Sequence, residues 1–148
     1  MKKILTILIA VLAFATVASA QPRALGVRAG YGGEISYQHT TGPGFIEADL
    51  GFLAGHGFYL TGVYDFILAN AGICNFYVGP GVQMGAWTDK DAAGFNLGLV
   101  GQMGVEFEIP SIPMNISIDW RPAFYFIGTG GGTAFNWASF ALGVRYRF

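Results

Sequence analysis

The sequence predicts an all-β fold, an eight-stranded antiparallel up-and-down transmembrane β-barrel. Residues 137–148 alternate between two faces: Ala138, Phe140, Leu142, Val144, Tyr146 and Phe148 on one, and Trp137, Ser139, Ala141, Gly143, Arg145 and Arg147 on the other. Successive side chains of a strand point to opposite faces, so this stretch has one apolar and one polar face. The composition is 53% hydrophobic and only 11% charged, yet no apolar run after Val17 approaches the roughly 20 residues of a membrane helix. A barrel wall with lipid outside and a polar lumen inside accounts for both observations.

Residues 1–20 have the pattern of a secretory signal peptide. Lys2 and Lys3 precede an apolar run over residues 4–17, and a small-residue cleavage site occupies residues 18–20. The alternative, a retained membrane anchor, is disfavoured because the run is short and ends in a cleavable motif. Residue 21 is Gln, not the Cys of a lipoprotein. We therefore expect an exported protein with one domain, the barrel, over residues 21–148.

Turn residues divide the remaining chain into eight segments that alternate in polarity. The expected strands span about residues 24–31, 33–39, 44–53, 58–68, 74–87, 94–109, 115–127 and 137–148. Eight is an even number, as a single-chain bacterial barrel requires. Pro80 and Pro122 fall inside strands, and because proline has no N–H to donate to a neighbouring strand, we expect a bulge or a missing pair at each.

Charged residues within the expected strands all take the face opposite the aromatic residues. These eleven lumenal candidates are Arg28, Glu34, Glu47, Asp49, Asp65, Glu106, Glu108, Asp119, Arg121, Arg145 and Arg147. An eight-stranded barrel is just wide enough for its own side chains to fill it, and buried charges must be paired. The pattern predicts a lumenal charge network that fills the barrel; the alternative interpretation of the same residues is a narrow proton or ion path.

Enzymatic chemistry is not indicated. His39 and His56 are the two histidines, and the expected topology places them at opposite ends of the barrel. None of the four serines after residue 20 has an obvious histidine neighbour, as acyl chemistry requires. No cofactor or metal site is predicted, and Cys74 is the single cysteine. Six basic residues against nine acidic ones after residue 20, a formal charge of minus three, give no reason to expect nucleic acid as a partner.

The segments Tyr77-Val78-Gly79-Pro80-Gly81 and Ile118-Asp119-Trp120-Arg121-Pro122, with the terminal Phe148, carry a family resemblance. The chain resembles small outer-membrane β-barrel proteins of the Bacteroidetes type, which are distantly similar to the OmpX and OmpA barrels. The resemblance implies a monomer in a Gram-negative outer membrane, in contact with its lipids and lipopolysaccharide. It also implies that Phe140, Leu142, Val144, Tyr146 and Phe148 form the signal recognised by the outer-membrane assembly machinery.

The function expected from these observations is that of an integral, non-enzymatic outer-membrane protein with a structural or surface-interaction role and a filled lumen. Two alternatives stay open. One is a narrow, porin-like channel for small solutes or ions, and the other is a lipid-modifying outer-membrane enzyme.

Overall fold

A computed structural model describes residues 23–30, 32–53, 56–129 and 134–148. The expected signal peptide at residues 1–20 lies outside the described residues. In the described part of the chain, no helix is long and apolar enough to span a bilayer.

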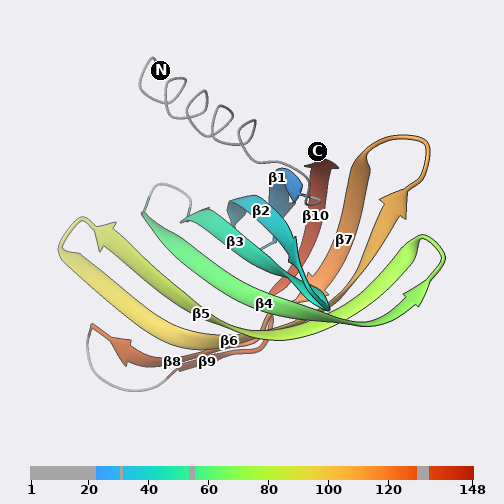
Figure 1. The fold of residues 1–148 in the computed structure, drawn as a ribbon. Coiled ribbons are helices and arrows are strands. Elements are labelled where there is room, and N and C mark those ends of the chain that lie inside the picture. The colour runs from blue at the N-terminus through green and yellow to red at the C-terminus, as the bar shows by residue number, and fades with distance from the viewer. Residues whose placement is uncertain (1–22, 31, 54–55, 130–133) are drawn as a thin grey trace, which may run out of the picture.

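The described residues form ten strand segments (Figure 1). They are β1 (Arg23–Ala29), β2 (Gly33–Thr41), β3 (Gly44–Leu53), β4 (Gly57–Ala71), β5 (Cys74–Asp89), β6 (Ala92–Ile109), β7 (Met114–Trp120), β8 (Ala123–Gly128), β9 (Ala134–Asn136) and β10 (Phe140–Arg147). Both β7 and β8 pair with β6, and together they occupy one position of the wall. Likewise β9 and β10 occupy the next, so the ten segments make eight strands.

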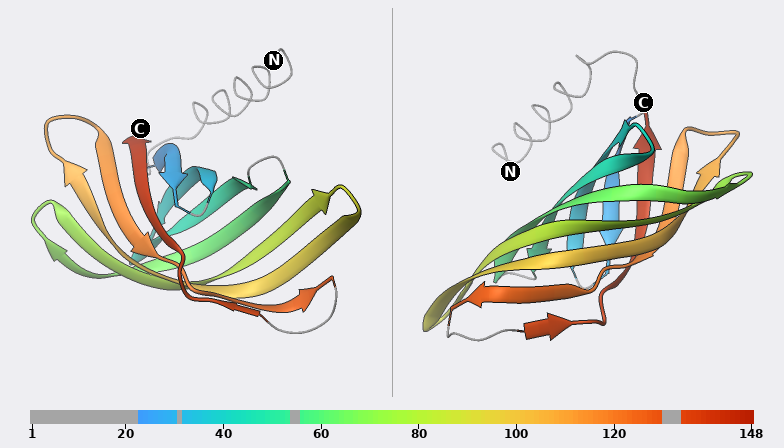
Figure 2. Two further views of the ribbon diagram at one scale, coloured as in Figure 1. Left: turned by 180° about the vertical axis from the view of Figure 1, so that it is seen from behind. Right: turned by 60° about the horizontal axis from the view of Figure 1, so that its bottom comes forward.

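The eight strands close into an antiparallel barrel, as the sequence predicts. Sequential neighbours pair from β1 through β6, β7 pairs with β10, and β10 pairs with β1. The first and last described residues meet at this seam, where Arg23 and Phe148 exchange backbone hydrogen bonds of 3.2 and 2.8 Å. Both therefore lie at one end of the barrel, and Figure 2 shows the strongly tilted strands wrapping around a single interior.

Tight turns at this end of the barrel depend on glycine. The β2–β3 and β4–β5 turns contain Gly42 and Gly72, whose φ angles are +54° and +65°. Residues with a side chain rarely adopt this left-handed conformation, whereas glycine does so at little cost. Both turns lie where the sequence places chain-breaking residues, so the register of these hairpins is set locally.

The two prolines that the sequence analysis placed inside strands, Pro80 and Pro122, both interrupt the hydrogen-bonded pairing, as predicted. Pro80 lies opposite Gly101 of β6, but on the β4 side pairing stops at the Val63–Gly81 pair and resumes only at the Phe66–Val78 pair. Pro122 lies between β7 and β8, outside any strand. Because proline lacks the N–H that a ladder needs, each site loses at least one pair.

The expectation that residues 137–139 belong to the last strand is wrong, and so is the lumenal position expected for Trp137. Trp137 is 65% exposed, on the outside of the barrel. Asn136 pairs with Ala123 and Phe140 pairs with Trp120 on either side of the Pro122 interruption. Three residues separate Asn136 from Phe140, but only two separate Trp120 from Ala123, so one strand has an extra residue. This extra residue is a bulge, which reverses the in-and-out alternation on its far side.

The interior of the barrel is polar and its outer wall is apolar, which is the reverse of a water-soluble globular fold. Large apolar side chains on the outer wall are well exposed, including Leu99 at 56% and Ile118 at 52%. The residues that alternate with these apolar ones along each strand point inward. Two examples are Asp119 and Gln102, which are 2% and 1% exposed. The strands thus bring charged and amide side chains from most of the chain into one narrow lumen.

Candidate functional site

The structure places all eleven lumenal candidates on the inner face of the barrel. Nine of them are buried, and Glu108 and Arg147 at the end near the chain terminus are partly exposed. Nine of the eleven also take part in ion pairs, centred on four arginines. The contacts of each arginine show how the lumen is filled.

Arg121 lies at the interruption between β7 and β8 and reaches across the barrel to β3. Its Nη2 donates to Glu47 Oε1 at 2.7 Å and to Asp49 Oδ2 at 2.5 Å. Its Nε donates to Gln102 Oε1 at 2.5 Å, and its Nη1 lies 3.5 Å from Glu34 Oε2. With 3% of its side chain exposed, this guanidinium is desolvated and depends on these partners.

Arg28 on β1 joins the β2 and β7 carboxylates. Its Nη1 donates to Glu34 Oε2 at 2.7 Å, and its Nε and Nη2 both donate to the Asp119 carboxylate. Such fork-like pairing is the strong form of a charge-assisted hydrogen bond. Because Glu34 also contacts Arg121, the two arginines belong to one connected network.

Arg145 on β10 is fully buried and extends this network below Glu47. Its Nη2 donates to Glu47 Oε2 at 3.0 Å, while Ser36 and Ser117 accept hydrogen bonds of 2.8 and 2.7 Å from the same guanidinium. Glu47 therefore links Arg121 to Arg145. The cross-strand neighbour of Ser117, Gly143, makes room here, since a Cβ on it would lie 2.5 Å from Ser117 Oγ.

Four of the eleven candidates do not belong to this connected network. Arg147 and Glu108 form a separate pair of 2.9 Å, with 30% and 40% of their side chains exposed. Asp65 accepts a hydrogen bond of 2.9 Å from Gln102 and forms no ion pair in the described part of the chain. Glu106 Oε2 has no hydrogen-bond partner among the described residues.

Neutral side chains complete the network, and the sequence analysis did not assign them to it. They are Ser36, Gln38, Tyr59, Tyr77, Gln102 and Ser117. Gln102 is typical: its amide donates to both Glu47 and Asp65 while its oxygen accepts from Arg121. All six share the inward alternation of the charged residues, which is the signal in the sequence that identifies them.

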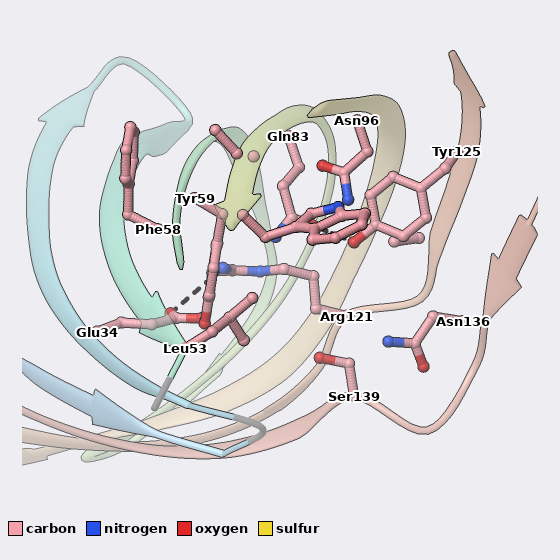
Figure 3. Close-up of a pocket in the computed structure, with 14 residues that line it drawn as sticks. Glu34, Leu53, Phe58, Tyr59, Gln83, Asn96, Arg121, Tyr125, Asn136 and Ser139 are labelled. Atoms are coloured by element: carbon pink, nitrogen blue, oxygen red, sulfur yellow. Dashed lines mark hydrogen bonds and ion pairs between the residues drawn. The ribbon is translucent and has the colours of Figure 1, made fainter. Parts of the chain in front are cut away.

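Above the network, at the end of the barrel away from Arg23 and Phe148, lies a pocket of about 230 Å³ that we call the mouth pocket (Figure 3). Arg121 and Glu34 form its floor. Its lining residues come from β2 to β6 and from the β8–β10 region: Glu34, Leu53, Phe58, Tyr59, Gln83, Gly85, Ala86, Trp87, Asn96, Arg121, Ala123, Tyr125, Asn136 and Ser139. The sequence analysis did not predict this pocket.

Glycines on neighbouring strands make room for the large side chains of the mouth pocket. A Cβ added at Gly94 would lie 2.2 Å from the indole of Trp87, its cross-strand partner. In the same way, a Cβ at Gly51 would lie 2.1 Å from the ring of Tyr59. These rings therefore lie flat against the wall, which holds them in fixed positions around the pocket.

The two histidines lie at opposite ends of the barrel, as the expected topology requires. His39 at the end of β2 accepts a hydrogen bond of 3.1 Å from Arg23, and His56 precedes β4 at the other end. Within the described residues, neither ring is hydrogen-bonded to a serine, and no cluster of three or more His, Cys, Asp or Glu side chains is arranged to hold a metal ion.

Comparisons with known proteins give no relative: no family model, curated protein or solved structure matches this chain.

The network gives a prediction for Arg121→Ala. The substitution removes the cation from Glu47 and Asp49, and we expect it to lower the free energy of unfolding by about 3–5 kcal/mol, as for other broken buried pairs. Urea unfolding of the purified protein in detergent micelles measures this. Arg147→Ala is the control, because its partly exposed pair contributes only about 0–1 kcal/mol. Equal losses for the two variants would contradict the network.

Proposed function

We propose that this protein is an integral, non-enzymatic barrel of a Gram-negative outer membrane, with a structural or surface-interaction role. The observation that carries the proposal is the inverted distribution of polarity around a closed wall. Soluble monomers rarely expose large continuous apolar surfaces, whereas this barrel exposes apolar side chains along its strands, with Val27 at 61% and Phe140 at 59%. Lipid tails solvate such a surface, and buried ion pairs replace water inside.

The same network supports the second part of the proposal, a lumen that is closed to solutes. Arg145, Glu47 and Asp65 are fully buried, and with Arg121 and Gln102 they fill the middle of the barrel. An eight-stranded barrel has no spare width around such a plug. This packing favours the structural role over the channel alternative, although the lumen carries more carboxylates than arginines.

The proposal includes the localisation and partners that the family resemblance implies. These are export by a signal peptide, insertion by the outer-membrane assembly machinery, contact with outer-membrane lipids and lipopolysaccharide, and a monomeric state. In support, the five residues of the proposed assembly signal all lie on the outer wall: Phe140, Leu142, Val144, Tyr146 and Phe148. A recognition factor would reach them before the strand is enclosed by lipid.

Leu99→Lys tests the membrane location of the outer wall. Leu99 lies near the middle of β6 with its side chain 56% exposed. In a bilayer, lysine at this depth is expected to cost about 2–4 kcal/mol of folding free energy in lipid vesicles. On a water-exposed surface the same change costs within about 0.5 kcal/mol. Leu99→Met is the matched control, and equal stability of the two variants in vesicles would refute the proposal.

Conductance tests the closed lumen. The wild-type protein, inserted into a planar lipid bilayer, is expected to carry no steady current, because the paired side chains leave ions no water-filled path. A protein-free detergent sample serves as the control for leakage. A reproducible open-channel current would contradict the closed lumen and would support the channel alternative.

Phe148→Ala separates the proposed assembly signal from the barrel seam. The backbone hydrogen bonds between Phe148 and Arg23 survive this substitution, so the seam itself stays intact. We expect less protein in the outer-membrane fraction of expressing cells, but unchanged unassisted folding into detergent micelles. Phe140→Leu, which keeps a large apolar group in the proposed signal, is the control. Full membrane yield for Phe148→Ala would argue against a role of Phe148 in assembly.

A further inference from the structure

The mouth pocket contains polar groups that the barrel itself does not use. Within the described part of the chain, no hydrogen bond engages the side chains of Asn96 or Ser139, which both line the pocket. Gln83 accepts a hydrogen bond of 2.9 Å from Tyr125, which leaves its amide N–H groups available. Among the described residues, Asn136 Oδ1 accepts only from the backbone N–H of Ala138. Three amides and a hydroxyl thus supply donors and acceptors to the pocket.

The position of Asn96 is built into the wall. Its cross-strand partner in β5 is Gly85, and a Cβ added there would lie 2.7 Å from Asn96 Oδ1. A glycine at this point lets the amide turn inward over β5. The free amide is therefore held by the same arrangement that holds Trp87 against Gly94.

The charges on the floor are already neutralised within the protein. Glu34 accepts 2.6 and 2.7 Å hydrogen bonds from Tyr59 and Arg28, and Arg121 donates to Glu47 and Asp49 below the pocket. A charged ligand would have to compete with these short contacts and pay to lose its own hydration. The pocket therefore suits a neutral ligand.

The remaining walls are aromatic. Tyr59, Trp87 and Tyr125 line the pocket and present apolar ring surface next to the amides (Figure 3). The volume of about 230 Å³ lies below the roughly 300–1,000 Å³ of sites for drug-sized ligands, so it has room for one small ring. A single sugar ring combines C–H surface for aromatic contact with hydroxyls in several directions for dispersed amides.

We propose that the mouth pocket binds one neutral hexose ring, through the Asn96, Gln83 and Ser139 side chains and the aromatic walls. The inference rests on the proposed function for the orientation of the barrel in the membrane. In that orientation Arg23 and Phe148 lie on the periplasmic side, so the pocket at the other end opens outside the cell. Two sources offer the same chemistry there: a free sugar, and a sugar of the lipopolysaccharide chains that surround a barrel in this membrane.

Trp87 provides the readout. The chain has three tryptophans, and Trp120 and Trp137 lie outside the pocket lining. The Trp120→Phe/Trp137→Phe protein, folded in detergent micelles, reports on the pocket through Trp87 alone. We titrate it separately with D-glucose, D-galactose, D-mannose and N-acetyl-D-glucosamine. At least one of them is expected to change the fluorescence saturably, with a dissociation constant in the millimolar range typical of one small ring.

Two substitutions in the pocket link the signal to the site. In the same single-tryptophan background, Asn96→Ala is expected to weaken the binding of that sugar about tenfold, and Ser139→Ala by a smaller factor. Asn70→Ala is the matched control, because Asn70 is an exposed amide on β4 near the opposite end of the barrel. Unchanged affinity in both pocket variants would overturn the proposal.

Lipopolysaccharide with its full saccharide chain, and its lipid part alone, distinguish the two sources. A response to the saccharide-bearing form but not to the lipid part assigns the ligand to the surrounding lipopolysaccharide, while a response to free sugars alone assigns it to a soluble source. An equal response to the lipid part, or no saturable response to any probe by a correctly folded barrel, would overturn the sugar site. Failure of the protein to insert into lipid vesicles would instead overturn the proposed function, so the two failures are distinguishable.

Discussion

The rest of the structure depends on one constraint, which is that an arginine buried inside a narrow barrel must find carboxylate partners there. Water cannot solvate Arg28, Arg121 and Arg145, because each is nearly or fully buried. Carboxylates from other strands take the place of that water, and Glu34 and Glu47 each serve two arginines. The pairs tie β1, β2, β3, β7 and β10 together across the lumen, in addition to the backbone ladders. The interior is thus held by electrostatic complementarity where a soluble protein would use apolar packing.

Much of the fold was predictable because strand alternation is a local property. Each inward position follows from its neighbours two residues away, and so the eight strands and the inner face of all eleven charged residues could be read from the sequence. The exception lies at Pro122. A bulge beside this proline moves Trp137 to the outside, and nothing in the alternation of residues 137–148 signals that change. Side chains alternate between the two faces only while the strand pairs continuously with its neighbours. Where that pairing is interrupted depends on the tertiary structure and not on the local sequence.

The sequence predicts which charged residues belong to the candidate site, but not which of them pair with one another. Arg121 and Glu47 lie 74 residues apart in the chain, and Arg145 and Glu47 lie 98 apart. Which arginine meets which carboxylate depends on strand tilt and stagger, which single-strand patterns do not encode. The mouth pocket was missed for a related reason. It depends on glycines such as Gly85 and Gly94 facing large side chains on the next strand, and such pairs become visible only when the register is known.

The interruption at Pro122 also separates two parts of the wall that differ in how many neighbouring strands hold them. Above it, β9 pairs with β8 alone in the described part of the chain, whereas β10 below it is held by β7 on one side and β1 on the other. The β8–β9 hairpin is therefore a rim segment attached along a single ladder. Insertions or deletions in this rim would leave the ladders of β10 with β7 and β1 intact, so the edge of the mouth pocket could change in shape without opening the seam that closes the barrel.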